Sequence, residues 1–181
     1  RRHATSKLKN NNLLDINSFG FRGEALPSLG AVGRLRIVSH KEGHGAYEIT
    51  VNGGDFSNTK PAARVLGTTI ELRDLFYATP ARLKFLRSNK SELKAITDVV
   101  KGLSISTPSV GFTLIDKIDG KSRILLQVRK EGDDSIKAKK NRLERVLGKE
   151  FSKNAISIDV TRNDINLTGC ICLPTYARAS N

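Results

Sequence analysis

The sequence predicts an α+β fold in two parts, each built around antiparallel strands. Three observations predict it: apolar and polar residues alternate in several short runs between residues 34 and 72, residues 91–103 carry one apolar stripe at helical spacing, and a strand-strand-helix-strand-strand pattern follows residue 108. The 181 residues suffice for one large or two small domains, and 38% of them are hydrophobic. We place the boundary in the Ser/Thr/Pro-rich segment 104–108, which gives domains 1–104 and 108–181.

The first part begins with a polar segment, residues 1–17, which we expect to form a loop. A glycine-containing turn then leads into a short helix, 24–29, where Pro27 falls in the tolerated first turn. Strands are predicted over 34–40, 47–51 and 65–72, and their sequential order favours an antiparallel sheet. Residues 74–87 switch to helical spacing with Thr79 as N-cap before Pro80, and the helix 91–103 is predicted to start at a Ser91 cap.

The second part begins with a predicted hairpin, 111–118 and 123–129, turned by Asp119-Gly120. A basic helix follows over 136–147 and ends at Gly148. Two further strands are expected over 155–161 and 166–173. This β-β-α-β-β order predicts a small α+β unit.

The charge balance points to a polyanionic partner. The chain carries 31 Lys and Arg against 18 Asp and Glu, a net charge of +13. Such a charge favours nucleic acid first and an acidic membrane surface second, although a generically basic protein, or a piece cut from acidic neighbouring segments, would show it too. No apolar run is long enough to cross a bilayer, and no secretory signal opens the chain. The chain has no Met, so we expect a fragment of a longer protein.

The stretch SFGFRGEAL, residues 18–26, is typical of a phosphate cradle. Glycines allow a tight backbone turn, and the helix after it presents unpaired amides and the positive end of its dipole to an anion. By its spacing alone, Gly20-x-x-Gly23 could equally be an ordinary loop before a helix.

Four segments together narrow the function. They read RHATSK (residues 2–7), GFRGEAL (20–26), GTT (67–69) and DLFYATPAR (74–82). In this order and at these spacings they closely resemble the bacterial MutL family of DNA mismatch repair proteins, from Arg2 to about Leu103 and more loosely to the end of the chain. The resemblance implies an incomplete GHKL-type ATPase α/β sandwich followed by a truncated domain like one of a ribosomal protein. It also implies a homodimer that forms on ATP binding, partners that include DNA, a mismatch-recognition protein and a downstream nuclease or helicase, no membrane contact, and a cytoplasmic, nucleoid-associated location.

The family's site residues can be carried over where the motifs match. The glycine motif would wrap the ATP phosphates, the RHATSK segment would form the lid, and the threonine of GTT would lie on the adenine side of the site. Arg22 could instead hold the shape of the loop, and Thr68 could be an ordinary strand threonine. The residues so assigned are Gly20, Phe21, Arg22 and Gly23 for the phosphates, Thr5, Ser6 and Lys7 for the lid, and Thr68 for the adenine side.

The catalytic motifs of the family are not expected in this chain. In the family, the water-activating glutamate, the Mg²⁺-binding asparagine and the adenine-binding Asp-x-Gly-x-Gly all precede RHATSK, where this sequence starts. We therefore expect no catalytic residue and no metal ligand here. ATP and Mg²⁺ would act in the parent protein, which would be the ATPase, and the isolated chain would bind them weakly or not at all.

DNA contact is predicted for the basic helix of the second part, because lysines and arginines on one helix can neutralise phosphates without reading sequence. The alternative is an ordinary solvated helix face. Two other functions also stay open: a sister ATPase such as a topoisomerase subunit or a chaperone, and an interaction module for DNA or protein without a nucleotide role. The candidate DNA contacts are Lys137, Lys139, Lys140, Arg142 and Arg145.

Overall fold

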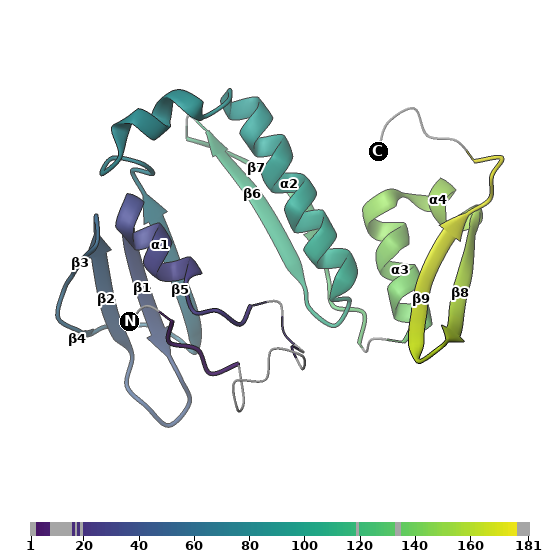
Figure 1. The fold of residues 1–181 in the computed structure, drawn as a ribbon, viewed down its shortest axis with the longest axis horizontal. Helices are drawn as coiled ribbons and strands as arrows, with labels where there is room; N and C mark the ends of the chain where they lie inside the picture. The colour runs from purple at the N-terminus through teal and green to yellow at the C-terminus, as the bar shows by residue number, and fades with distance from the viewer. Residues whose placement is uncertain are drawn as a thin grey trace. The chain divides into compact units, whose positions relative to one another are not determined.

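The computed structural model describes residues 3–7, 16, 18, 20–118, 120–132 and 135–176. The chain forms two compact units, Arg1–Leu86 and Arg87–Asn181, which differs from the boundary predicted at 104–108. The helix α2 (Asn89–Ser106) is the reason. It packs against the hairpin and the helix that follow it, so it belongs to the second unit (Figure 1).

An antiparallel sheet forms the body of the first unit, as the alternating runs predicted. Strand β1 (Arg34–His40) lies between β2 (Tyr47–Asn52) and β5 (Gly67–Arg73). Two short strands, β3 (Asp55–Phe56) and β4 (Lys60–Pro61), pair with β2. The helix α1 (Ala25–Val32) lies on one face of this sheet (Figure 1).

The register gives the sheet two chemically different faces. Leu35 pairs with Val51 and Ile37 with Ile49, so these apolar side chains share the face toward α1. Leu35 and Val51 are buried there. Gly30 lets the helix approach closely, because a Cβ at this position would lie 2.8 Å from Val51 Cγ1. The opposite face carries the arginines and glutamates of the same strands.

After β5 the chain forms an irregular turn and a short 3₁₀ helix, where a longer helical segment was expected. Asp74 and Phe76 have positive φ angles of 49° and 69°, which interrupt any helix through this segment. The 3₁₀ helix η1 spans Pro80–Phe85, and Thr79 makes no side-chain capping bond to it. Pro80 still occupies the first helical turn, as predicted.

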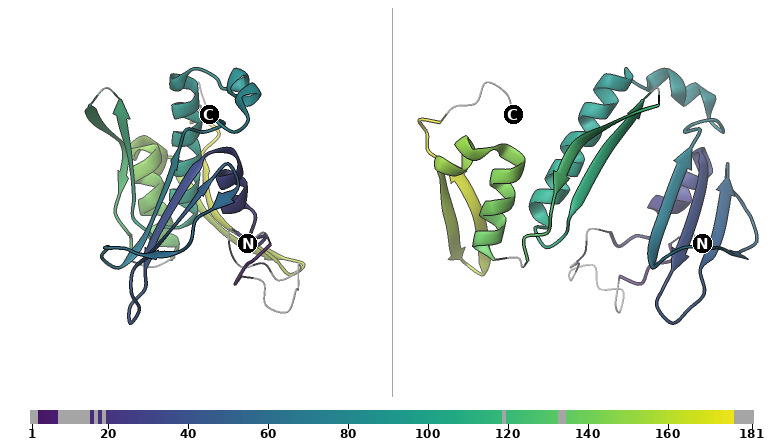
Figure 2. Two further views of the ribbon diagram at one scale, coloured as in Figure 1. Left: turned by 90° about the vertical axis from the view of Figure 1, so that its left-hand side faces the viewer. Right: turned by 180° about the vertical axis from the view of Figure 1, so that it is seen from behind.

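In its described residues the second unit contains two antiparallel hairpins and three helices. Strands β6 (Phe112–Ile118) and β7 (Lys121–Val128) form one two-stranded sheet, and β8 (Ala155–Arg162) and β9 (Ile165–Cys172) form another (Figure 2). Helix α3 (Ile136–Leu147) packs on α2 and β9, and α4 (Lys149–Lys153) follows it. The expected strand-helix order is therefore present, with α4 added; Asp119, expected in the first turn, lies outside the described residues.

The long helices start at serine caps. Ser88 Oγ accepts from the Ser91 amide at the start of α2, and Ser135 Oγ accepts from the Ala138 amide at the start of α3. The α2 cap thus lies three residues before Ser91, the predicted cap. Among the residues that the structure describes, no helix has both the length and the apolar character that a membrane span requires.

Candidate functional site

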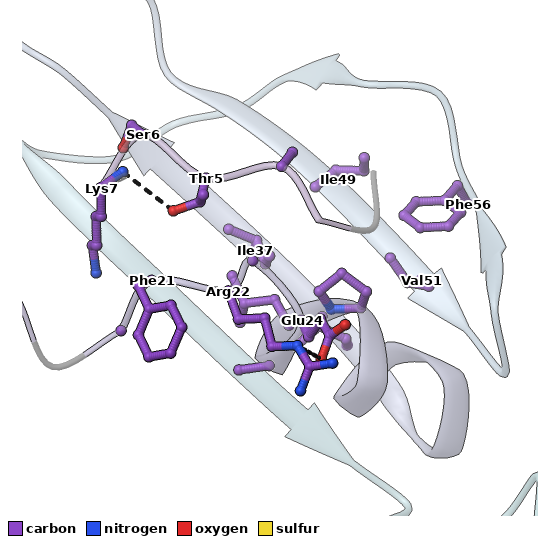
Figure 3. Close-up of a pocket in the computed structure, with 17 residues that line it drawn as sticks. Thr5, Ser6, Lys7, Phe21, Arg22, Glu24, Ile37, Ile49, Val51 and Phe56 are labelled. Carbon is purple, nitrogen blue, oxygen red and sulfur yellow. Dashed lines mark hydrogen bonds and ion pairs between the residues drawn. The ribbon is translucent and has the colours of Figure 1, made fainter. Parts of the chain in front are cut away.

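A cavity of about 760 Å³ in the first unit brings the RHATSK segment, the glycine motif and the sheet together (Figure 3). Its walls come from three places: residues 4–7, residues 20–27 at the start of α1, and the apolar face of β1 and β2. All of the residues predicted for the phosphates and the lid line it: Thr5, Ser6, Lys7, Gly20, Phe21, Arg22 and Gly23.

Gly23 is the point where the two motifs touch. Its φ is +66°, and a Cβ built on it would lie 2.3 Å from the backbone oxygen of Ala4. Both facts require glycine: the backbone angle is costly for any other residue, and a side chain would displace the RHATSK backbone. The second glycine of the motif therefore closes the turn against the segment from residues 4–7.

Lys7 places a positive charge over the first glycine. A Cβ on Gly20 would come within 3.6 Å of Lys7 Nζ, so the ammonium lies beside this stretch of main chain. The Lys7 amide donates to Thr5 Oγ1 at 3.2 Å, which curls the segment toward the turn (Figure 3). Ser18 Oγ donates to the Gly20 carbonyl at 2.9 Å and braces the turn from its other side.

Glu24 links the two motifs through a small polar cluster that the sequence did not reveal. Its Oε2 lies 3.0 Å from Arg22 Nε, and its Oε1 lies 3.0 Å from His3 Nδ1. Arg22 keeps 74% of its side chain exposed. The guanidinium contacts Glu24 (Figure 3), the kind of contact that the alternative interpretation of Arg22 predicts, while most of its side chain is exposed.

The N-terminus of α1 opens into the same cavity. The first intrahelical bond runs from the Ser28 amide to the Glu24 carbonyl at 3.0 Å. The Ala25 and Leu26 amides precede this bond, so they have no intrahelical acceptor, and both residues line the cavity. Together with Lys7, these donors make this end of the cavity attractive to an anion.

The floor of the cavity is apolar. Ile37, Ile49 and Val51 form it, and Phe56 closes its edge (Figure 3). Thr68 lies beyond this floor: it pairs with Ser39, two residues along β1 from Ile37, so it shares the same face of the sheet. Its hydroxyl lies 2.8 Å from Ser39 Oγ, and it is not among the residues that line the cavity.

The described residues suit a phosphate-bearing ligand better than a divalent metal. A volume of about 760 Å³ falls in the range of small-molecule sites. Within the described ranges no group of three or more His, Cys, Asp and Glu side chains could hold a metal ion. Glu24, the acid in the cavity wall, already contacts Arg22 and His3.

The basic helix α3 differs from its prediction at one position. Lys137 is exposed, and Lys139 and Lys140 are half-buried. Arg142 is fully buried and is corrected here: its guanidinium donates to four backbone carbonyls at 2.6–2.9 Å, those of Ser104, Pro108, Val110 and Arg129. It therefore joins α3 to α2 and the first hairpin, and it has no free edge for a phosphate.

Arg145 remains exposed but is paired with an acid. Its Nε lies 2.7 Å from Glu131 Oε1, and Arg142 Nε lies 3.7 Å from the same oxygen. The Glu131 side chain is only 5% exposed. Much of the charge of Arg145 is thus already compensated, so the exposed cationic part of α3 consists mainly of its lysines.

A signal for the buried arginine was present in the sequence. Ala138, Arg142 and Val146 are spaced at i, i+4 and i+8, which places the arginine in line with the apolar residues of α3. The contact between Glu24 and His3, by contrast, joins residues 21 positions apart, and no local pattern in the sequence predicts it.

Curated relatives match the chain over its whole length. It is 48% identical over 181 residues to the DNA mismatch repair protein MutL of Rhodospirillum rubrum, which covers 99% of the chain and 28% of that protein. The MutL of Rhizobium etli is likewise 48% identical over 182 residues. The chain thus spans somewhat more than a quarter of the length of these relatives. No protein-family model matches it.

Solved structures share the fold. The Aquifex aeolicus MutL ATPase domain complexed with ADP superposes with a TM-score of 0.62 at 28% identity, over 76% of the chain and 52% of that domain. The N-terminal domain of a DNA repair protein superposes with a TM-score of 0.68 over 93% of the chain and 51% of its own length; at 21% identity it supports the fold alone. The motifs, the sequence match over the whole chain and this fold agree, and the chain is homologous over its whole length to part of the DNA mismatch repair proteins named MutL.

Proposed function

We propose that this chain is part of the nucleotide-binding and DNA-handling region of a MutL-type mismatch repair protein. In that role the cavity of the first unit holds the phosphates of ATP. One observation carries the proposal: the RHATSK segment seals against the glycine motif at Gly23, with the Lys7 ammonium beside Gly20. A solved MutL ATPase domain is described as complexed with ADP, which supports a nucleotide as the ligand of this region.

Different residues of the cavity would contact different parts of ATP. The amides of Gly20–Gly23 and of the first turn of α1 would donate to phosphate oxygens, and Lys7 would supply a charge-assisted contact. Thr5 and Ser6 would complete the lid. Thr68 would lie toward the adenine, one step along the sheet from the apolar floor. Arg22 would hold the turn through Glu24.

Hydrolysis is assigned to the longer protein and not to these 181 residues. The glutamate that activates water and the asparagine that binds Mg²⁺ are expected in the longer protein, and a general base must reach the water that it activates. The isolated chain should bind ATP weakly and should not hydrolyse it. ATP-dependent homodimerisation, and contact with a mismatch-recognition protein and a downstream nuclease or helicase, are proposed for the parent protein in the bacterial cytoplasm.

DNA contact is proposed for the lysines of α3, of which Lys137 is exposed and Lys139 and Lys140 are half-buried. Lys137, Lys139 and Lys140 can neutralise phosphates without reading bases. Arg145 would contribute less, because Glu131 compensates it, and Arg142 is excluded by its burial. The net charge of +13 supports the same partner.

A segment exchange tests the nucleotide proposal. These 181 residues can replace the homologous segment of the Rhodospirillum rubrum protein, which is 48% identical to them. The exchanged protein should hydrolyse ATP and should restore a normal mutation rate in a strain that lacks its own MutL. Within it, Lys7→Ala should lower kcat/KM for ATP by about tenfold to a hundredfold, in line with the loss of one charge-assisted phosphate contact.

Lys41→Ala is the matched control, because Lys41 is an exposed lysine in the turn between β1 and β2. It should leave kcat/KM unchanged within about twofold. If Lys7→Ala behaves like Lys41→Ala, the RHATSK lysine does not contact the phosphates, and the proposed site is wrong.

A further inference from the structure

The first-unit sheet carries a second hollow, of about 370 Å³, on the face opposite the nucleotide cavity. Successive residues of a strand point to opposite faces, so the even-numbered residues of β1 lie here while Leu35 and Ile37 face α1. We call this hollow the arginine groove. Six polar side chains from β1, β2 and β5 define it: Arg34, Arg36, Thr50, Asn52, Glu71 and Arg73.

The register places two arginines of this groove directly opposite each other. Arg34 pairs with Arg73 on β5 and with Asn52 on β2. Like charges in a directly opposed pair destabilise a sheet, so such a pair needs a compensating anion. The groove itself offers one acid, Glu71, against three arginines.

The available carboxylates are unevenly shared. Arg36 is well compensated, since it contacts Glu48 at 2.5 Å and Glu71 at 3.3 Å. Arg34 contacts Asp74 at 3.0 Å. Among the residues that the structure describes, Arg73 lies near one carboxylate, the already shared Glu71, at 3.9 Å, and its side chain is 74% exposed. Its guanidinium is therefore the least compensated charge in the groove and the most open to solvent.

An aromatic ring adjoins Arg34, the arginine opposite Arg73. The Arg34 guanidinium lies 4.3 Å from the centroid of Tyr77, which orients it over the ring. Surfaces that bind nucleic acid strands combine cations along the backbone with aromatic side chains for the bases. Thr50 and Asn52 add neutral hydroxyl and amide groups of the kind that contact phosphate oxygens.

We propose that the arginine groove binds the phosphodiester backbone of a nucleic acid strand. A phosphodiester between Arg34 and Arg73 would relieve their repulsion and accept from both. The groove belongs to the first unit, whereas the lysines of α3 belong to the second, and it lies on the face of the first-unit sheet opposite the nucleotide cavity. It is a separate site, and its assignment does not depend on ATP.

The test measures the fluorescence anisotropy of a labelled oligothymidylate of about 30 nucleotides against the whole chain, at several salt concentrations. The double variant Arg34→Gln/Arg73→Gln should bind at least about tenfold more weakly than the unmodified chain. The slope of log K against log salt concentration should become less negative by about one for each arginine removed. The control is Arg87→Gln/Arg123→Gln, which removes two arginines that are each 69% exposed and each paired with one carboxylate. It should weaken binding by no more than about threefold.

A variant that removes a negative charge from the groove tests the same site if the arginine double variant fails to fold. Glu71→Gln removes the acid of the groove and should tighten binding about threefold to tenfold, because the arginines lose a competitor for the phosphates. Glu42→Gln raises the net charge equally, from an exposed turn, and should change affinity by less than about twofold.

Three results would overturn the proposal. The first is an equal loss in the arginine double variant and its control, and the second is an equal gain in Glu71→Gln and Glu42→Gln. The third is a double variant that keeps its oligonucleotide affinity but loses binding to phosphatidylglycerol vesicles, which would make the groove a membrane contact. The ATPase of the exchanged protein reports on the other face of the sheet, so the two proposals can fail separately.

Discussion

Single residues hold the two motifs of the cavity together, and Gly23 matters most among them. Gly23→Ala should combine a strained left-handed backbone with a clash against the Ala4 oxygen, 2.3 Å from the new Cβ. We expect the RHATSK segment to separate from the turn, with a loss of at least about tenfold in the kcat/KM of the exchanged protein for ATP.

Gly43→Ala provides the matched control for this substitution. Gly43 has a similar φ of +74°, but a Cβ at this position would meet no atom within 4 Å. It shares the backbone cost of about 1 kcal/mol without the clash. If both variants lose activity equally, the contact with Ala4 is not what holds the site.

Arg142 is the corresponding residue of the second unit, and its role there is structural. Arg142→Leu should leave four backbone carbonyls without their donor. We expect the free energy of unfolding of this unit to fall by about 3–5 kcal/mol, as for other broken buried charge networks. Urea unfolding followed by circular dichroism measures it.

Arg145→Leu serves as the comparison, because Arg145 contacts the same Glu131 from an exposed position. Arg145→Leu should lower the free energy of unfolding of this unit by less than about 1.5 kcal/mol. Equal losses in the two variants would mean that the carbonyl contacts of Arg142 add little to the stability of the unit.

At the scale of elements, the charged ladder on the first sheet makes its stability depend on pH. The Arg36 guanidinium, and after it the Lys60 ammonium, hold the pKa of the Glu48 carboxyl below its ordinary value of 4.5. A lowered folded-state pKa stabilises the sheet above the unfolded pKa, and this contribution is lost as the pH falls through the folded value. The melting temperature should therefore drop as the pH is lowered from about 5 toward 3.

Glu48→Gln should reduce this drop in melting temperature between about pH 5 and pH 3, the acid limb of the curve, because it removes the carboxylate that must otherwise be protonated. Glu42→Gln, in the exposed turn after β1, should leave the limb as steep as before. A Glu48→Gln chain with an unchanged acid limb would show that Arg36 and Lys60 do not couple to folding.

Hydrophobic spacing in the sequence predicts some elements of this fold and misses others. The alternating runs predicted β1, β2 and β5 closely because each strand has one apolar face, and that signal is contained in the strand itself. The segment before η1 was mispredicted as helical, since the positive φ angles of Asp74 and Phe76 leave no trace in hydrophobic spacing. The residues that the motifs assigned to the phosphates and the lid line one cavity, and their roles toward ATP stay predictions. The contact between Glu24 and His3 depends on how the chain folds, so the sequence does not predict it.

At the scale of the whole molecule, the boundary could not be read from composition. Residues 104–108 look like a linker because they contain Ser, Thr and Pro, but Ser104 is fully buried and its carbonyl accepts from Arg142. The hydrogen bond from Arg142 to the Ser104 carbonyl, 38 positions away along the chain, attaches this segment to the second unit. Composition reports the polarity of a segment, and only packing reports its partners.

The division at Leu86/Arg87 predicts where a protease should cut first. Arg82, Lys84 and Arg87 lie at exposed positions in and after η1, whereas the backbone at 104–108 is held by Arg142. Limited trypsin digestion should therefore release a stable fragment that begins between residues 83 and 88 and retains α2 and both hairpins. Mass spectrometry of the early products identifies it. Early cleavage at Lys101 in the unmodified chain would contradict the assignment of α2 to the second unit.

The Arg142→Leu variant should also be cut at Lys101 in the same digestion, because α2 would lose its hydrogen bond to Arg142 of α3.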